Sequence, residues 1–178
     1  GEIAAVTLQN KIYFAGGGSN DPNSFGVTSR IDIYDDVSGS WSTSSLQEAK
    51  TSMASIAVGN KMYCAGGNTW PFFGVWTCSV EILDINGTHT ISNLHGENWW
   101  QFNAGQRAVL KNDKIVFCIT PWSSSEFDIY NTSTNEWSVG ILPRVCNGNS
   151  IISVNNTIYI AGGYVNNIPS NQVWKLEF

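Results

Sequence analysis

Asn10-Lys11-Ile12-Tyr13-Phe14-Ala15-Gly16-Gly17 is a short apolar run that begins after an Asn and ends in two glycines. The same pattern returns at 60–67 and at 156–163, and a weaker copy lies at 113–120. The four copies follow one another at a mean spacing of about 49 residues, a period typical of β-propeller blades. Internal repetition therefore predicts the architecture of this chain of 178 residues.

A second element follows each copy of the first. It comprises Ser29-Arg30-Ile31-Asp32-Ile33-Tyr34-Asp35 and its counterparts at 79–84, 126–131 and 172–177. Trp41 and Trp137 then follow polar turns. Each unit is thus predicted to contain four strands, a to d: a precedes the Asn turn, b carries the apolar run, c is the second element and d starts at the Trp.

These motifs resemble the kelch repeat family, whose units combine a Gly doublet, a Tyr-Asp pair and a spaced Trp on a four-stranded blade. The resemblance implies an all-β, kelch-type β-propeller, with blade faces buried between neighbours and the Trp filling the space between blades. The doublet suits close approach of a neighbouring backbone. The third unit has Ile119-Thr120 for the doublet and the second has Thr90 for the Trp, so these blades are expected to pack less regularly.

Counting strands predicts an incomplete ring. The units are expected at 1–48, 49–99, 100–143 and 144–178, with the first beginning near Ile3 and the last ending in strand c at Phe178. That gives four strands in three blades and three in the fourth, which lacks its outer strand. We expect the remaining blades to come from a longer chain, a second chain or self-association.

Aromatic side chains gather in the b–c and d–a connections, which emerge together at one end of the blades. This end is the predicted ligand-binding face, because aromatic residues on loops of a rigid scaffold are typical of recognition. The alternative is that the rings cover the ends of neighbouring blades. The residues are Trp70, Phe72, Phe73, Trp76, Trp99, Trp100, Phe102 and Trp122.

The kelch resemblance also draws attention to the start of strand a, where family members often bind through Arg or Ser. Lys50, Cys146 and Phe102 stand at that position, and Arg144 lies two residues from Cys146. Lys50 and Arg144 are therefore candidate binding residues. They do not form the strongly cationic pocket that acidic peptides require.

Catalysis is the competing class, since similar architectures host copper radical oxidases resembling galactose oxidase and sugar mutarotases. The chain has only His89 and His95 as histidines, too few for imidazole-rich copper ligation. Other carboxylates are scattered, namely Asp21, Glu48, Glu97 and Glu126, whereas Asp32, Glu81 and Asp128 recur at one strand c position and are interpreted as structural. We expect no enzyme activity, metal site or cofactor.

Net charge and hydropathy limit the classes of partner that this chain is expected to bind. The formal charge is −5 with 13% charged residues, which disfavours a nucleic-acid partner. No apolar run reaches the roughly 18 residues of a membrane span. The abundance of Asn, Ser, Thr and Trp leans towards an extracellular or periplasmic setting, and three glycosylation sequons occur, at Asn86, Asn131 and Asn155.

The four cysteines, Cys64, Cys78, Cys118 and Cys146, lack the spacing of a metal site and are interpreted as structural thiols. Cys64 and Cys78 stand at the two ends of one b–c connection, so a disulfide between them is the alternative to free thiols. Taken together, the sequence predicts a non-catalytic module that binds another protein through the aromatic-rich face. The alternative is a carbohydrate-binding or carbohydrate-active propeller that stacks sugar rings on the same residues.

Overall fold

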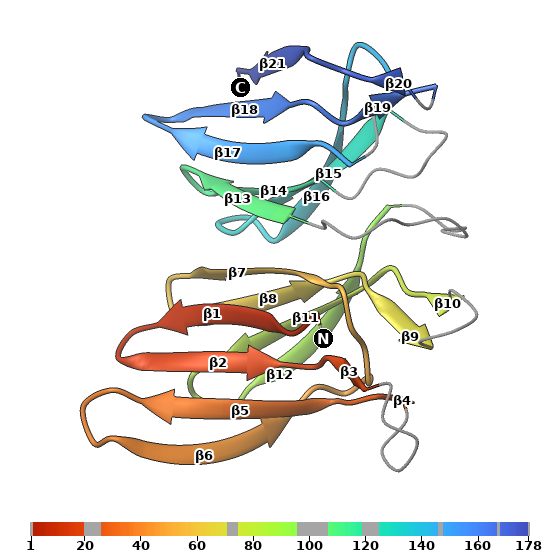
Figure 1. Cartoon of the computed structure of the whole chain (residues 1–178). Helices are drawn as coiled ribbons and strands as arrows, with labels where there is room; N and C mark the ends of the chain where they lie inside the picture. Colours follow the sequence, from red (N-terminus) through yellow and green to blue (C-terminus); the bar gives the residue numbers. More distant parts are fainter. Residues whose placement is uncertain are drawn as a thin grey trace. The chain divides into compact units, whose positions relative to one another are not determined.

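The computed structural model of the chain contains β-strands, and no helix, in the part that it describes (Figure 1). That part comprises residues 2–19, 26–70, 75–95, 107–118, 125–145, 148–166 and 168–177. The chain divides into two compact units, Gly1–Leu94 and His95–Phe178. Each unit has its own sheets and its own apolar core, so the two are described separately.

The first unit holds two four-stranded antiparallel sheets with the same strand order. The first sheet is β1 (Ala4–Leu8), β2 (Lys11–Ala15), β5 (Arg30–Asp35) and β6 (Ser40–Ser45). The second sheet is β7 (Ala54–Val58), β8 (Lys61–Ala65), β11 (Ser79–Asp84) and β12 (His89–Asn93). In both sheets the strands follow one another in chain order, as the a-to-d reading predicts.

The second unit holds a third sheet of four strands and a fourth sheet of three. The third is β13 (Arg107–Lys111), β14 (Lys114–Cys118), β15 (Glu126–Asn131) and β16 (Glu136–Ile141). The fourth is β17 (Ser150–Val154), β18 (Thr157–Ala161) and β21 (Val173–Leu176). Among the described residues, the fourth sheet thus has strands a, b and c and no strand d.

Three of the b–c connections contain a short antiparallel ribbon that the sequence analysis does not predict. The ribbons pair β3 (Gly18–Ser19) with β4 (Gly26–Val27), β9 (Asn68–Trp70) with β10 (Val75–Trp76), and β19 (Tyr164–Val165) with β20 (Ile168–Pro169). Within the first unit, β4 lies beside β9. We call the end of each unit that carries these ribbons its ribbon end.

The opposite ends of strands a and b are joined by two-residue turns, as predicted. In the first sheet Leu8 faces Lys11 across the turn, and Gln9 has a φ of 55°. Gly59, Asn112 and Asn155 occupy the same place in the other sheets, also with positive φ. Gly and Asn tolerate this backbone region at low cost, so these turns follow from local chemistry.

The Gly doublets make room for the connection between strands d and a. The N–H of Gly17 donates to the carbonyl of Lys50 at 3.0 Å, and a Cβ on Gly16 would lie 2.2 Å from that carbonyl oxygen. A Cβ on Gly67 would lie 2.6 Å from the carbonyl oxygen of Thr51. The predicted reason for the doublet, close approach of a neighbouring backbone, is therefore observed.

Separate apolar clusters fill the two units. One cluster in the first unit is built around Ile31, Met62 and Cys64, and one in the second around Val116, Ile158 and Ile160. Continuous apolar b strands supply both clusters, as expected for sheets that are covered on both faces.

Trp41 packs on strands of its own sheet. It is 64% exposed and lies on its own sheet, with its ring 5.1 Å from Tyr34 and 6.1 Å from Phe14. Trp137 packs on the corresponding residues of the third sheet, Tyr130 and Phe117. The Trp therefore contacts its own b and c strands through aromatic packing, whether or not a neighbour covers the face.

Candidate functional site

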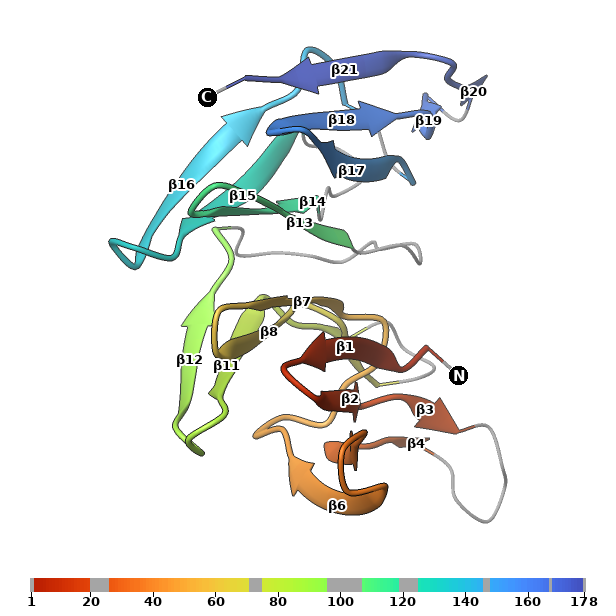
Figure 2. The same ribbon diagram turned by 90° about the vertical axis from the view of Figure 1, so that its left-hand side faces the viewer.

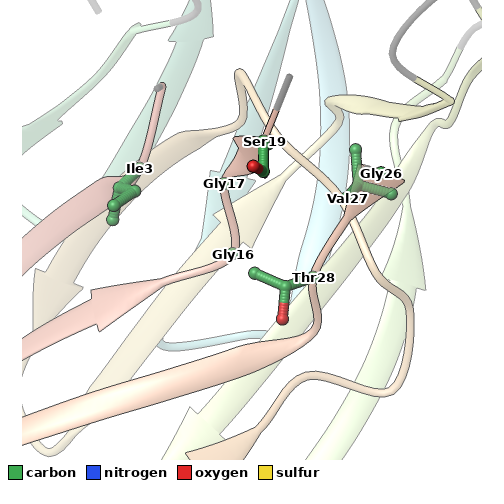
Figure 3. A pocket seen from close by; sticks show the side chains of 8 residues that line it. Ile3, Gly16, Gly17, Ser19, Gly26, Val27 and Thr28 are labelled. Atoms are coloured by element: carbon green, nitrogen blue, oxygen red, sulfur yellow. The ribbon is translucent and has the colours of Figure 1, made fainter. Parts of the chain in front are cut away.

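The ribbon end of the first unit contains a cavity of about 510 Å³ between the first residues of the chain and the ribbon β3–β4 (Figure 3). Figure 3 shows Ile3 on one side of it and Val27 and Thr28 on the other. Gly16 and Gly17, which follow β2, lie between them and are called the floor of the cavity. The lining residues are Ile3, Gly16, Gly17, Gly18, Ser19, Gly26, Val27 and Thr28. This volume lies in the range of small-molecule and peptide-anchor sites.

The chemistry of this cavity comes mainly from apolar groups and from backbone. The Thr28 hydroxyl points away from it and accepts the backbone N–H of Arg30 at 3.1 Å, so Thr28 offers its methyl group instead (Figure 3). Ser19 is the side-chain hydroxyl that points towards the glycine floor. Because four of the eight lining residues that the structure describes are glycines, backbone amides and carbonyls make up much of the described lining.

Exposed apolar side chains stand on the ribbons. Val75 on β10 is 51% exposed, and Tyr164 and Ile168 on the β19–β20 ribbon are 50% and 68% exposed. Trp76, predicted to bind, lies on β10 and is half-buried. Trp70 is on β9. The other aromatic residues predicted for this face, Phe72, Phe73, Trp99, Trp100, Phe102 and Trp122, lie outside the described residues.

Lys50 was a candidate binding residue, but the structure buries its side chain completely. Its ammonium lies 3.2 Å from Glu81 Oε1 and donates to Ser79 Oγ at 2.9 Å, and it is 4.0 Å from Glu48 Oε2. A buried ammonium needs such partners, because desolvation of an unpaired charge is very costly. In this structure Lys50 is thus a buried, paired residue and does not lie on a binding surface. Arg144, the other basic candidate, is exposed beyond β16.

Glu81, on β11, is the centre of this network and is also completely buried. Its two carboxylate oxygens accept the backbone N–H groups of Gln47 at 2.7 Å and Glu48 at 3.2 Å. His89 Nε2 lies 2.7 Å from Glu81 Oε2 and is shielded from solvent, without the alignment of a hydrogen bond. The recurring carboxylate therefore holds the d–a connection of the first sheet against the second sheet.

Ser79 extends the network towards solvent. Its hydroxyl accepts from Lys50 and donates to Glu48 Oε2 at 2.7 Å, and the Glu48 carboxylate is 39% exposed. Close by, burial raises the pKa of the Cys64 thiol to about 12, with Lys50 opposing and Glu81 reinforcing the effect. A protonated, buried thiol is a poor nucleophile. Cys64, Cys78 and Cys118 are free thiols, so no Cys64–Cys78 disulfide is present.

The network and the cavity are joined through the backbone of Lys50. Its carbonyl accepts from Gly17 at 3.0 Å and its N–H donates to the carbonyl of Thr28 at 3.3 Å, and both of these residues line the cavity. The residue whose side chain is buried in the network is therefore hydrogen-bonded through its backbone to two residues that line the cavity. Sequence reasoning missed this cavity, although the run Gly16-Gly17-Gly18-Ser19 in a b–c connection was a usable signal.

Asp128 is held in a similar way in the second unit. It is buried and accepts the backbone N–H of His95 at 2.9 Å. Burial raises the pKa of the Asp128 carboxyl, and this hydrogen bond and the charge of His95 partly offset the rise. The matching residue of the first sheet, Asp32, is instead part-exposed and pairs with Arg30. In two of three sheets, the recurring carboxylate is thus buried and bound to backbone.

In the described ranges no three His, Cys, Asp or Glu side chains cluster in a way that could hold a metal ion. Within the same ranges no helix has the length and apolar character needed to cross a membrane.

Comparison with known proteins finds no matching family model and no matching curated protein. Among solved structures, 211 chains match. One of them is described as the structure of YjhT; it has a TM-score of 0.69, is 15% identical to this chain and covers 97% of it. The chain spans 64% of the length of that YjhT chain. At this identity the likeness concerns the fold alone.

Proposed function

We propose that the chain forms kelch-type β-propeller blades and is a non-catalytic module that binds another protein at its ribbon end. The blade assignment is supported by the a-to-d strand order, which recurs in three sheets and as far as strand c in the fourth, and by the likeness in fold to a longer chain. An array of sheets with unlike ends is a rigid scaffold on which one set of connections is free to specialise.

The observation that carries the binding proposal is the composition of the ribbon ends. Their b–c connections rise as paired ribbons with exposed Val75, Tyr164 and Ile168, whereas the a–b connections are tight turns of Gln, Asn, Gly and Asp. Exposed apolar and aromatic side chains on such projections are typical of protein-binding surfaces.

A protein ligand fits the cavity better than a sugar does. The hydroxyl of Thr28 is turned away and accepts the N–H of Arg30, so among the described lining residues only Ser19 directs a side-chain hydroxyl towards the floor, whereas sugar hydroxyls require several converging polar side chains. An aliphatic side chain of an extended peptide matches Ile3 and Val27, while its backbone lies along the glycines. Carbohydrate binding remains the alternative, and the experiment below separates the two.

Site-specific photo-crosslinking tests the proposal. A benzophenone amino acid replaces Val75 at the ribbon end, and a matched control replaces Val37, which is 82% exposed in the c–d turn of the first sheet. After irradiation in an extract of the native cells, we expect a discrete protein adduct at position 75 and none at position 37. Unlabelled wild type should compete for the adduct, and unlabelled Val75→Asp should compete less.

A glycan array probed with the same proteins gives the second readout. Equal adducts at both positions would contradict the proposal, since they would show adhesion without a preferred face. Glycan binding that Val75→Asp abolishes, without any protein adduct, would replace the proposal with the carbohydrate alternative.

A further inference from the structure

Two of the complete sheets carry the same aromatic group on one face. In the first sheet, Trp41 of strand d packs on Tyr34 of strand c and Phe14 of strand b, with ring centroids 5.1 and 6.1 Å apart. The third sheet repeats this group with Trp137, Tyr130 and Phe117. In both sheets the Trp ring therefore occupies the space over strands b and c.

The second sheet has His89 in place of this Trp. Tyr34 and Leu83 are each the next-to-last residue of strand c. Across to strand d, Tyr34 faces the Trp of its sheet, and Leu83 faces His89. The sequence spacing predicts Thr90 at the Trp position, but Thr90 faces the residue before Leu83 and so points to the other side of the sheet. The second sheet thus has Leu in place of Tyr and His in place of Trp.

These smaller side chains border a cavity of about 210 Å³ between the first and second sheets, which we call the inter-sheet cavity. Leu83 and His89 line it from the second sheet. Tyr13, Ile31 and Ile33 line it from the first. A smaller side chain leaves open space unless its surroundings collapse onto it, and the neighbouring sheet does not close this space.

The inter-sheet cavity is apolar in its depth and opens at the turn between β11 and β12. Ile31 and Met62 in its wall are at most 1% exposed, whereas Gly87 and Thr88 in the turn are exposed. The turn is fixed by its own hydrogen bonds, because Asp84 N–H donates to the Thr88 carbonyl and Gly87 N–H to the Asp84 carbonyl, both at 2.9 Å. Figure 2 shows this turn on the opposite side of the first unit from the ribbon β3–β4.

We propose that the inter-sheet cavity binds a small aromatic molecule of about the size of indole, whose ring takes the space that Trp fills in the first and third sheets. An apolar cavity of about 150 Å³ in a protein interior stays free of water and binds benzene. The larger volume here suits a bicyclic ring. Lys11 and Asp84, the lining residues with full charges, have opposite signs, so the site favours an uncharged ligand.

The side chains of the wall suit an aromatic ring in particular. Met62 supplies a polarizable thioether and Tyr13 an aromatic ring, and both attract aromatic rings. Ile31 and Ile33 add aliphatic surface. Thr88 at the mouth carries a hydroxyl that suits one polar substituent, such as the N–H of indole.

A methyl NMR titration of the full protein with indole tests the proposal. We expect ring-current shifts at the methyl groups of Ile31, Ile33 and Met62, which saturate with a dissociation constant below about 1 mM. Glucose, a ring of hydroxyl groups, should shift none of these methyl groups, because the wall lacks the several polar side chains that a sugar needs.

Variants that fill the inter-sheet cavity give the second readout. His89→Trp gives the second sheet the residue that Trp41 is in the first, and Leu83→Tyr does the same for Tyr34. Each should weaken indole binding by at least about 10-fold, because its ring occupies the same space. The matched control is Thr90→Trp, which places a Trp on the other side of the sheet at an exposed position and should keep the dissociation constant within about 2-fold.

The proposal is overturned if indole causes no saturable shift at the three methyl-bearing residues, or if it binds His89→Trp, Leu83→Tyr and Thr90→Trp equally well. Shifts of the same size at exposed Val75 and Ile141, which do not line the inter-sheet cavity, would also overturn it, since they would show adhesion to apolar surface in general. The result is independent of binding at the ribbon end, which lies at the opposite end of the first unit.

Discussion

Gly16 and Gly39 have nearly the same positive φ angle, 66° and 67°. Their surroundings differ. A Cβ on Gly16 would meet the carbonyl oxygen of Lys50 at 2.2 Å and Met53 Cε at 2.4 Å, whereas a Cβ on Gly39 meets nothing within 4 Å. The two positions therefore separate the cost of a left-handed backbone from the cost of crowding.

Gly39→Ala should lower the free energy of unfolding by about 1–2 kcal/mol, the cost of placing a side chain in the left-handed region. Gly16→Ala should cost at least about 2 kcal/mol more, because Lys50 and the cavity floor must move. Urea unfolding followed by circular dichroism measures both. If the two variants lose the same free energy of unfolding, the backbone of Lys50 moves away from a Cβ at position 16 at little cost.

Glu81 satisfies two backbone N–H groups and one buried ammonium, so its removal should be severe. Glu81→Ala should lower the free energy of unfolding by about 3–5 kcal/mol, since it leaves Lys50 buried without its closest carboxylate. Asp32→Ala, at the matching part-exposed position, should cost about 1 kcal/mol or less.

A double variant tests the cause of this loss. Lys50→Met with Glu81→Leu removes both charges and should recover part of the stability lost in Glu81→Ala, as apolar replacements of buried pairs often do. No recovery would mean that the two backbone N–H groups of Gln47 and Glu48, rather than the ammonium, dominate the effect.

At the scale of the strands, the recurring carboxylate and the buried Leu that follows strand d in each complete sheet form one device. Leu46 and Leu94 are each followed by a residue whose N–H binds the carboxylate of Glu81 or Asp128. Leu142 is followed by Pro143, which has no N–H, and Trp174 stands where the carboxylate would be, opposite Ile160 on the b strand. Donor and acceptor are thus absent together at that junction, so neither is left buried without the other.

Asp128 gives this device a pH dependence. Its folded pKa is raised by burial, so its contribution to stability is fully present below the unfolded pKa of about 3.9 and is lost as pH rises through the folded value. Asp128→Asn does not ionise. The stability of the variant minus that of wild type should therefore increase from about pH 4 upwards and then level off.

Urea unfolding at a series of pH values measures this difference, and Asp32→Asn, at the matching part-exposed position, is the control. A difference for Asp128→Asn that falls as pH rises would contradict the prediction, because it would mean that the His95 N–H stabilises the carboxylate more than burial penalises it.

The long elements of the sheets were predictable from the sequence. The c strands coincide with the predicted runs at 79–84 and 126–131, and the d strands contain Trp41 and Trp137 as expected. The ribbons were not predictable, because β3, β4, β10, β19 and β20 have two residues each, too few to show a period in the sequence. Their pairing comes from the geometry of the sheets that they connect.

At the scale of the whole molecule, the two units should respond separately to damage of their cores. The described core clusters around Ile31 and around Ile158 share no residue. Ile158→Ala should destabilise the second unit by about 2–5 kcal/mol, and Glu81→Ala should act on the first. Amide exchange at increasing urea reports each unit by its own b-strand amides.

In this experiment, Ile158→Ala should lower protection at Val116 and leave Cys64 close to wild type, and Glu81→Ala should do the reverse. A common loss of protection in both units for either variant would show that the chain unfolds as one cooperative body.

The order of apolar residues, glycines and turn residues was enough to determine the repeated sheets, because strand formation and tight turns depend on neighbours in sequence. The Asn and Gly turns and the Gly doublets have local causes of this kind. The cavity and the burial of Lys50 were decided by tertiary structure. Lys50 meets Ser79 at a separation of 29 residues and Gln47 meets Glu81 at 34, and only the packing of two sheets brings such partners together.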